Sequence, residues 1–166
     1  TCEVTPHHLY FADKERDEMR VNPPIRTEED RLFLIQMIKE GYVDAISTDH
    51  APHSAQEKKQ NAPGFIGLET AFSTCYEVLV KSGIVSLNEL IRIMSTKPSE
   101  ILNIKKGKLE KGYLADFTLI DLDKSYEYKE EEILSKSKNS LMIGKKLHGQ
   151  IKRVYRKGVL KYENNR

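Results

Sequence analysis

The sequence predicts an α/β fold of parallel strands and helices that continues into a β-rich tail. In the first hundred residues, short β-branched runs alternate with segments of helical periodicity, and polar residues gather where each run ends. Around residues 97–106 the pattern changes to turn residues followed by alternating strands. We therefore expect an α/β part over residues 1–100 and a helix-to-β tail over residues 101–166.

Composition narrows the class of protein. The 166 residues are 39% hydrophobic and 31% charged, as in a globular chain, and the net charge is only +2. Basic residues are interleaved with acidic ones, so we expect no nucleic-acid partner. No apolar run approaches the roughly 20 residues of a membrane-spanning helix, so we expect no membrane partner. Two cysteines, Cys2 and Cys75, make no disulfide framework and favour a reducing cytoplasm.

The first predicted strand is "CEVTP", a short buried run that ends at Pro6 because proline cannot donate to a strand ladder. His7 and His8 follow it directly. "MRVNPPIR" repeats this arrangement, with strand-like residues, then Asn22, then two prolines that force an extended turn. Because Thr1 opens inside strand-like sequence without an initiator methionine, we expect the chain to be a piece of a longer protein.

A helix is predicted next, capped by Thr27 and continuing to Gly41. Its apolar positions recur at helical spacing: Leu32, Leu34, Ile35 and Ile38. "YVDAISTDH" then predicts a further strand, apolar at Val43, Ala45 and Ile46, that ends with Asp49 and His50. The polar segment 51–67 follows, and loops of this length in compact domains are usually functional.

Two helices are predicted after this loop, over Glu69–Lys81 and Ser86–Ser95, the second opening with Ser86 and Glu89 at capping-box spacing. The tail predicts a strand over Phe117–Ile120 and two further strands about a turn at Lys157 and Gly158.

Polar residues at these strand ends suggest a shared site, because the ends of parallel strands in an α/β barrel face one rim. The residues that could converge there are His7, Asn22, Asp49, His50 and His53. Histidine nitrogen with aspartate oxygen is the donor mixture of hydrolytic zinc sites. A carboxylate beside a metal-bound water can also move its proton, a role that suits Asp49.

Each pattern has a structural alternative. The His7–His8 pair could be an ordinary surface or core pair, and "DHAPH" could simply cap a turn, although three titratable residues there are costly unless something binds them. Gly64 and Gly67 could admit a substrate carboxylate or could be turn residues. On the residues alone, a metal-dependent hydrolase and a structural role both stay open.

Several segments resemble one family closely. "CEVTPHHL", "VNPPIR", "DAISTDHAPH", "EKK", "PGFIGLETAF" and "GKLEKGYLADFTLID" follow one another as in the C-terminal half of the dihydroorotase family, in the amidohydrolase superfamily. The resemblance covers essentially the whole chain. "DHAPH" followed by "GLET" is its most specific part, whereas the segment around "LADF" is general to the superfamily.

The resemblance implies the C-terminal part of a distorted (β/α)₈ barrel beside a small β-sandwich, with two zinc ions in each complete active site. It implies reversible cyclisation of N-carbamoyl-L-aspartate to dihydroorotate in de novo pyrimidine biosynthesis. His7 resembles a ligand of one zinc, and Asp49 resembles a ligand of the other and the general base and acid. The residues that resemble substrate-binding positions are Asn22, His53, Pro63, Gly64 and Phe65. His8 and His50 match no ligand.

The family's remaining ligands are not in this sequence: a His-x-His pair, a further histidine, and a bridging carboxylate or carbamylated lysine. We therefore expect the isolated chain to be inactive and its first partner to be the N-terminal half of a barrel. The resemblance also allows a homodimer or an association with a transcarbamoylase. Alternatives are an allantoinase or another cyclic amidohydrolase, and a non-catalytic dihydroorotase-like scaffold subunit; Asn22 and His53 favour dihydroorotase over allantoinase.

Overall fold

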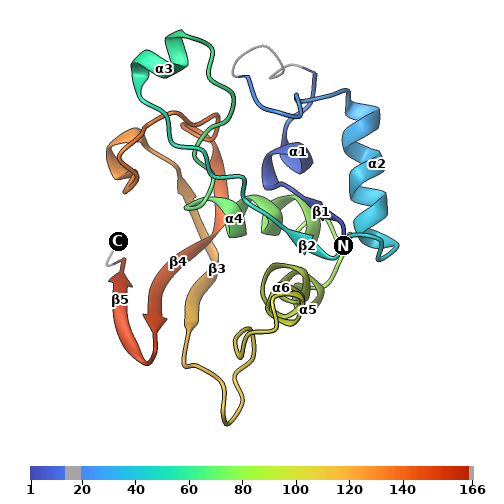
Figure 1. The fold of residues 1–166 in the computed structure, drawn as a ribbon, viewed down its shortest axis with the longest axis vertical. Coiled ribbons are helices and arrows are strands. Elements are labelled where there is room, and N and C mark those ends of the chain that lie inside the picture. Colours follow the sequence, from blue (N-terminus) through green and yellow to red (C-terminus); the bar gives the residue numbers. More distant parts are fainter. Residues whose placement is uncertain (14–19, 165–166) are drawn as a thin grey trace.

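The computed structural model describes residues 1–13 and 20–164. At its centre is a parallel pair of short strands, β1 (Glu3–Val4) and β2 (Ala45–Ile46), in the register Glu3↔Ala45 and Val4↔Ile46. Helices surround this pair, and an antiparallel sheet lies beside them (Figure 1). The predicted α/β class with parallel strands is confirmed, whereas closure into a barrel stays a prediction.

Helix α1 (Pro6–Tyr10) begins directly after β1, so His7 and His8 lie in a helical turn. The side chain of Thr5 accepts a hydrogen bond from the His8 N–H, and Pro6 occupies the first turn, where a missing N–H costs nothing. The strand-like residues before Asn22 form no strand in the part of that segment that the structure describes, and Met19 lies outside it.

Helix α2 (Glu28–Lys39) confirms the predicted cap, because the side chains of Thr27 and Asp30 bond reciprocally to each other's backbone N–H. Ile35 and Ile38 are buried, whereas Leu32, which shares their helical spacing, is 52% exposed.

The two later helices are less regular than predicted: the first lies within the predicted Glu69–Lys81, and the second runs past its predicted end. Helix α4 (Ala71–Cys75) continues as a π-helical turn over Tyr76–Val80. Helix α5 (Leu87–Ile91) continues through a second π-helical turn, Arg92–Thr96, into α6 (Lys97–Ile101). The predicted end at Ser95 is wrong, because Pro98 falls in the first turn of α6, where proline is tolerated.

Only one of the two hydrogen bonds of the expected capping box forms at the start of α5. Ser86 accepts a hydrogen bond from the Glu89 N–H at 3.1 Å, but the Glu89 carboxylate turns to Arg92 at 2.7 and 2.8 Å instead of back to the cap. The cap therefore fixes the helix start through a single bond.

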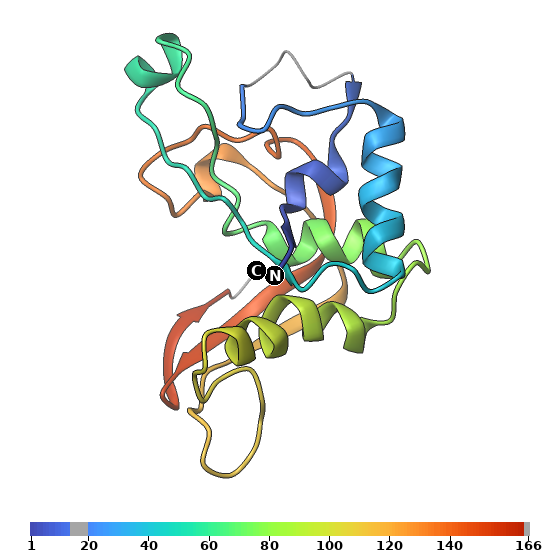
Figure 2. The ribbon, with the colours of Figure 1, turned by 45° about the vertical axis from the view of Figure 1, so that its right-hand side comes forward.

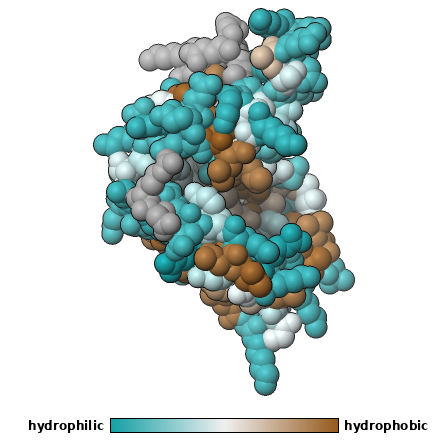
Figure 3. Space-filling model, turned by 90° about the vertical axis from the view of Figure 1, so that its left-hand side faces the viewer, coloured by the Kyte–Doolittle hydropathy of each residue, from teal (hydrophilic) through white to brown (hydrophobic). Residues whose placement is uncertain are grey.

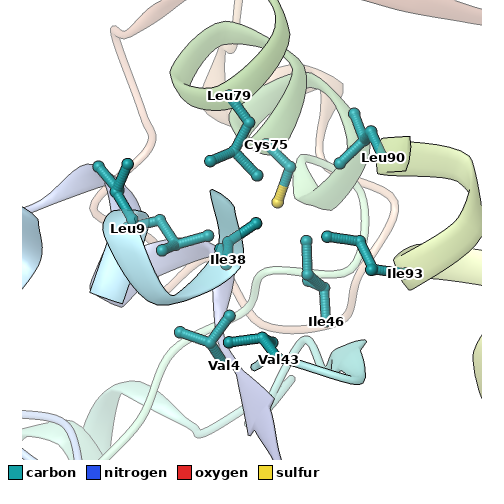
Figure 4. Close-up of a cluster of buried hydrophobic side chains, with 10 residues drawn as sticks. Val4, Leu9, Ile38, Val43, Ile46, Cys75, Leu79, Leu90 and Ile93 are labelled. Carbon is teal, nitrogen blue, oxygen red and sulfur yellow. The ribbon is translucent and has the colours of Figure 1, made fainter. Parts of the chain in front are cut away.

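The main core lies between the parallel strands and the helices (Figure 4). Its fully or nearly buried members are Val4, Leu9, Ile35, Ile38, Val43, Ile46, Cys75, Leu79, Leu90 and Ile93. Cys75, on α4, is fully buried in this core. Side chains from β1, β2, α1, α2, α4 and α5 meet in this cluster, so the core fixes the strand ends relative to the helices.

The tail contains the antiparallel sheet, ordered β3 (Phe117–Glu127), β4 (Lys146–Arg156) and β5 (Val159–Glu163). The predicted turn joins β4 to β5 through Lys157 and Gly158, both with positive φ, as a tight hairpin turn requires. Strand β3 runs past the predicted Ile120, because β4 continues to pair with it as far as Glu127. A second sheet layer and the boundary at 97–106 stay predictions.

A second core joins the tail to the α/β part, with Phe11, Val21, Ile25, Phe65 and Ile66 packed against Tyr128, Ile133, Met142 and Leu147. Two cavities of about 580 and 890 Å³ lie against the sheet, and Phe72 lines both. Apolar side chains gather on the face shown in Figure 3. Among the described helices, none has both the length and the apolar character needed to cross a membrane.

Candidate active site

The parallel pair places His7 and Asp49 at the same edge. Val4 and Ile46 are register partners, and His7 and Asp49 each lie three residues beyond them. The Ser47 N–H donates to the Val4 carbonyl at 3.0 Å, which extends the pairing towards Asp49. The two donor residues of the predicted metal site therefore leave the sheet side by side, at its carboxyl edge.

The His7 ring is buried, with 5% of the residue exposed, and it packs against the rings of His8 and Phe65 at centroid distances of 4.5 and 5.0 Å. Burial, aided by the neighbouring His8, lowers the pKa of His7 to about 3, so the ring is neutral at pH 7. Within the described part of the chain its Nε2 atom is buried without a hydrogen-bond partner. A neutral imidazole with a free buried nitrogen is the state that a metal ligand requires.

Asp49 is exposed at the end of β2, with a left-handed backbone at φ +46°, a conformation that aspartate tolerates better than most residues. Among the described residues, no hydrogen bond or ion pair engages its carboxylate. The neighbouring His50 supports the turn, because its Nδ1 accepts hydrogen bonds from the N–H groups of Gly67 and Leu68, both at 3.2 Å. That bonding accounts for His50 without a ligand role.

His8 positions the turn that carries Asn22. Its Nδ1 lies 2.6 Å from the Thr5 hydroxyl, and its Nε2 lies 2.9 Å from the Pro23 carbonyl oxygen. The turn has a cis peptide between Asn22 and Pro23, and Asn22 is exposed. The structure therefore ties Asn22 to the helix that bears His7.

Residues 51–66, here called the arm, project from the end of β2 and carry the short helix α3 (Ala55–Lys59) (Figure 2). The arm closes on itself at its base, where the Ala51 N–H donates to the Phe65 carbonyl at 3.0 Å. Further along, His53 Nε2 lies 2.9 Å from the Pro63 carbonyl oxygen. His53 and Pro63 thus meet across the arm.

The backbone of the arm's returning segment is mostly satisfied within the chain. The Gly64 carbonyl accepts hydrogen bonds from Lys58 Nζ at 2.8 Å and from Asn139 Nδ2 at 3.3 Å, and the Gly64 N–H donates to the Arg20 carbonyl at 2.8 Å. Among the described residues, the Phe65 N–H has no such partner. It is the backbone donor of this segment that a ligand could use.

Sequence reasoning missed Lys58 and Asn139. Lys58 lies within the quoted "EKK", but its bonds to the Ala62 and Gly64 carbonyls depend on how the arm folds back. Asn139 lies in the tail, and the sequence gives no local pattern that marks it.

The predicted site residues are thus only partly brought together. His7 contacts Phe65, and His53 contacts Pro63, whereas Asp49 shares with His7 a place at the sheet edge without a described contact. Across residues 1–13 and 20–164, no cluster of three or more metal-ligating side chains occurs. His7 and Asp49 would fit two positions of a metal site, and no further ligand lies beside them among the described residues.

Comparison with known proteins gives the family. The sequence profile of the amidohydrolase family matches residues 7–161. The chain belongs to the amidohydrolase family. This amidohydrolase is 45% identical over 163 residues to the dihydroorotase of Clostridium botulinum and 46% identical over 172 residues to that of Elusimicrobium minutum. The matches cover 98% and 99% of this chain but 41% and 40% of the relatives, so it spans about two fifths of their length.

Solved structures share the fold of this amidohydrolase. The L-hydantoinase (dihydropyrimidinase) of Arthrobacter aurescens has a TM-score of 0.91 at 26% identity, over 98% of this chain and 39% of that structure. The dihydropyrimidinase of Brevibacillus agri has the same TM-score at 21% identity and the same coverage. The described arrangement of helices and sheet is therefore that of a part of these enzymes.

Proposed function

We propose that this chain carries half of the active site of a dihydroorotase, a zinc-dependent cyclic amide hydrolase of de novo pyrimidine biosynthesis in the cytoplasm. The observation that carries the proposal is the buried, neutral His7 Nε2 at the same sheet edge as the Asp49 carboxylate, neither of which has a partner among the described residues. The names of relatives at 45% and 46% identity supply the substrate class. The substrates would be dihydroorotate and N-carbamoyl-L-aspartate.

The donor chemistry fits zinc, of which two ions would complete the site. His7 offers a nitrogen that burial keeps neutral, and Asp49 offers an oxygen that no described group engages. When bound, the metal would acidify a water molecule and polarise the carbonyl that is attacked. The further ligands would come from a segment outside these 166 residues.

In hydrolysis, Asp49 would accept the proton of the attacking water while the water oxygen adds to the ring carbonyl of dihydroorotate. It would return that proton to the ring nitrogen as the C–N bond breaks. The sum is one water added to give N-carbamoyl-L-aspartate, and cyclisation is the reverse. The exposed position of Asp49 at the strand end leaves its carboxylate free for both transfers.

Substrate contacts are proposed for Asn22, His53 and the returning segment Pro63–Phe65. His53 is held against the Pro63 carbonyl, and the available Phe65 N–H lies next to the ring that packs on His7. A substrate carbonyl or carboxylate could accept a hydrogen bond from that N–H and still lie close to the sheet edge that carries His7 and Asp49.

A chimaera tests the proposal most directly. This chain replaces the matching 41% of Clostridium botulinum dihydroorotase, whose remaining sequence supplies the other segments. The product, here called the assembled enzyme, is purified with zinc and assayed for dihydroorotate hydrolysis. We expect turnover within about tenfold of the unaltered relative, since the segments are 45% identical.

A folded assembled enzyme without dihydroorotate turnover would contradict the proposal. The same preparation is assayed with hydantoin, dihydrouracil and allantoin, because the solved relatives include hydantoinases and dihydropyrimidinases. Preference for one of these would favour another cyclic amidohydrolase. Zinc binding without turnover of any of them would favour a scaffold role; association with a second copy or a transcarbamoylase stays a prediction.

A further inference from the structure

Asn139 stands at the base of the arm although it belongs to the tail. It lies in the connection between β3 and β4, 75 to 88 residues along the chain from the arm residues that its side chain contacts. Figure 2 shows this connection beside the point where the arm leaves the molecule. A contact that spans so much sequence fixes the arm relative to the tail.

One side-chain amide holds both sides of the arm. On the outgoing side, Asn139 Nδ2 donates to the Ala51 carbonyl at 3.2 Å and Oδ1 accepts from the His53 N–H at 3.3 Å. On the returning side, Nδ2 donates to the Gly64 carbonyl at 3.3 Å. The Asn139 backbone adds a fourth bond, since its carbonyl accepts from the Ile66 N–H at 2.9 Å.

This bonding pattern needs the chemistry of asparagine. The carbonyls of Ala51 and Gly64 need two N–H donors, and the His53 N–H needs an acceptor. A side-chain amide supplies both in one orientation, because its nitrogen carries two protons and its oxygen accepts. An aspartate of the same shape would place a carboxylate oxygen against the carbonyls of Ala51 and Gly64. Ser137 reinforces the arrangement, because its hydroxyl lies within hydrogen-bond distance of both the His53 carbonyl and Asn139 Oδ1 and can donate its one proton to either.

We propose that Asn139 is a positioning residue that holds the arm, and through it His53 and the Pro63–Phe65 backbone, in the conformation that receives substrate. The inference rests on the proposed function for the identity of that substrate. Asn139 acts through the residues it holds, since its own polar atoms are occupied by the arm backbone. Misplacing such groups weakens substrate binding even when the reacting residues are intact.

The test compares Asn139→Asp with Asn88→Asp in the assembled enzyme. Asn88 is exposed in helix α5 and undergoes the same chemical change away from the arm. We expect Asn139→Asp to raise the KM for dihydroorotate by about tenfold or more and to change kcat less. Hydrogen–deuterium exchange of residues 51–66 should become faster, with exchange of α2 and α4 unchanged. The control should leave KM and exchange at their original values.

Unchanged exchange over residues 51–66 would overturn the role of Asn139 in holding the arm, and faster exchange with an unchanged KM would overturn its role in positioning. If Asn139→Asp does not fold, Ser137→Ala removes part of the same network, and unchanged exchange and KM there would also overturn the inference. A parent chimaera that leaves dihydroorotate unhydrolysed contradicts the proposed function instead; the exchange measurement still decides whether Asn139 holds the arm.

Discussion

Among the described residues no partner reaches the buried Nε2 of His7, and such an atom costs about 1–3 kcal/mol unless a partner engages it. A bound ion, a water molecule or a reacting group can be that partner. Asp49 differs, because its free carboxylate is exposed and costs little. Burial therefore keeps the His7 ring neutral, as a metal ligand requires, and exposure keeps the Asp49 carboxylate accessible.

Replacing Asp49 by alanine in the assembled enzyme should lower kcat for dihydroorotate about 10²- to 10⁴-fold, because the proton acceptor and donor is lost. Steady-state kinetics at saturating zinc would measure this. Asp123→Ala is the matched control, since Asp123 is exposed on β3 away from the candidate site and should keep normal turnover. Near-normal turnover of Asp49→Ala would remove Asp49 from the reaction.

Cys75 and Cys2 should differ sharply in reactivity towards iodoacetamide. Burial raises the pKa of the Cys75 thiol far above its ordinary value, so it stays protonated and covered at pH 8, whereas Cys2 is exposed in this chain. Peptide mass spectrometry of the assembled enzyme should find Cys75 alkylated only after denaturation. Labelling of native Cys75 as fast as in the unfolded protein would contradict the described core.

At the residue scale, the sequence placed His7 and Asp49 beyond the ends of two strands, and the pairing of those strands confirms that placement, whereas their roles stay predictions. The placement could be predicted because β-branched runs followed by polar residues are visible in the sequence itself. Asn139 could not be found in this way. The partners of that side chain are backbone groups far along the chain, and their closeness results from tertiary packing of the tail. "SKSKNS" carries no local sign of those partners.

At the scale of the element, the arm depends on a glycine. Gly64 has φ +100°, and a Cβ added there would lie 2.6 Å from the Cβ of Ala51, on the opposite side of the arm. Two segments approach each other that closely only if one of them lacks a side chain. The sequence left Gly64 open between a turn residue and a position that admits a substrate carboxylate. The structure gives it the positive φ of a turn residue and a close approach to Ala51, and the substrate contact stays a prediction.

Gly64→Ala should destabilise the arm by about 1–3 kcal/mol, because overpacking adds to the strain of a left-handed backbone. Gly112→Ala is the matched control: its φ is +94°, but no atom lies within 4 Å of the added Cβ. Faster hydrogen–deuterium exchange of residues 51–66 and a raised KM should appear for Gly64→Ala alone. Equal effects of the two variants would show that the close approach to Ala51 does not matter.

Other elements show where local signals suffice. Thr27 and Asp30 cap α2 as predicted, because a capping box needs only residues three apart. The "TPHH" start of α1 carried a usable signal that was missed, since threonine followed by proline is typical of a helix start. The π-helical turns after Cys75 and Ile91 depend on packing, and the apolar spacing alone does not reveal them.

At the scale of the whole molecule, apolar side chains are exposed on more than one element. Leu32 and Phe33 on α2 are 52% and 60% exposed, and further apolar side chains are exposed over the sheet (Figure 3). A helix in an α/β fold normally buries such positions against a neighbouring element. The helical spacing of Leu32 shows that a face of α2 is apolar, but it does not show which segment covers that face.

We expect the 166-residue chain expressed alone to hydrolyse no dihydroorotate with added zinc and to associate through its exposed apolar surface. Activity assays would measure the hydrolysis of dihydroorotate. Light scattering, together with the binding of a hydrophobic dye, would measure the association. Leu32→Lys with Phe33→Glu should reduce association, whereas Glu29→Lys, on an already polar part of α2, should not. Turnover by the chain near that of the assembled enzyme would contradict the two-part site.

The bonds from Asn139 to the arm also limit how such enzymes can be recombined. A crossover between two relatives near residues 97–106 would take the arm from one parent and Asn139 from the other. In the recombined enzyme, the side chain at position 139 would no longer hydrogen-bond to the arm unless both parents carry an amide at this position. Asn139 and the arm should therefore be exchanged together. Exchange of the tail alone should succeed only between parents that have the same residue at position 139.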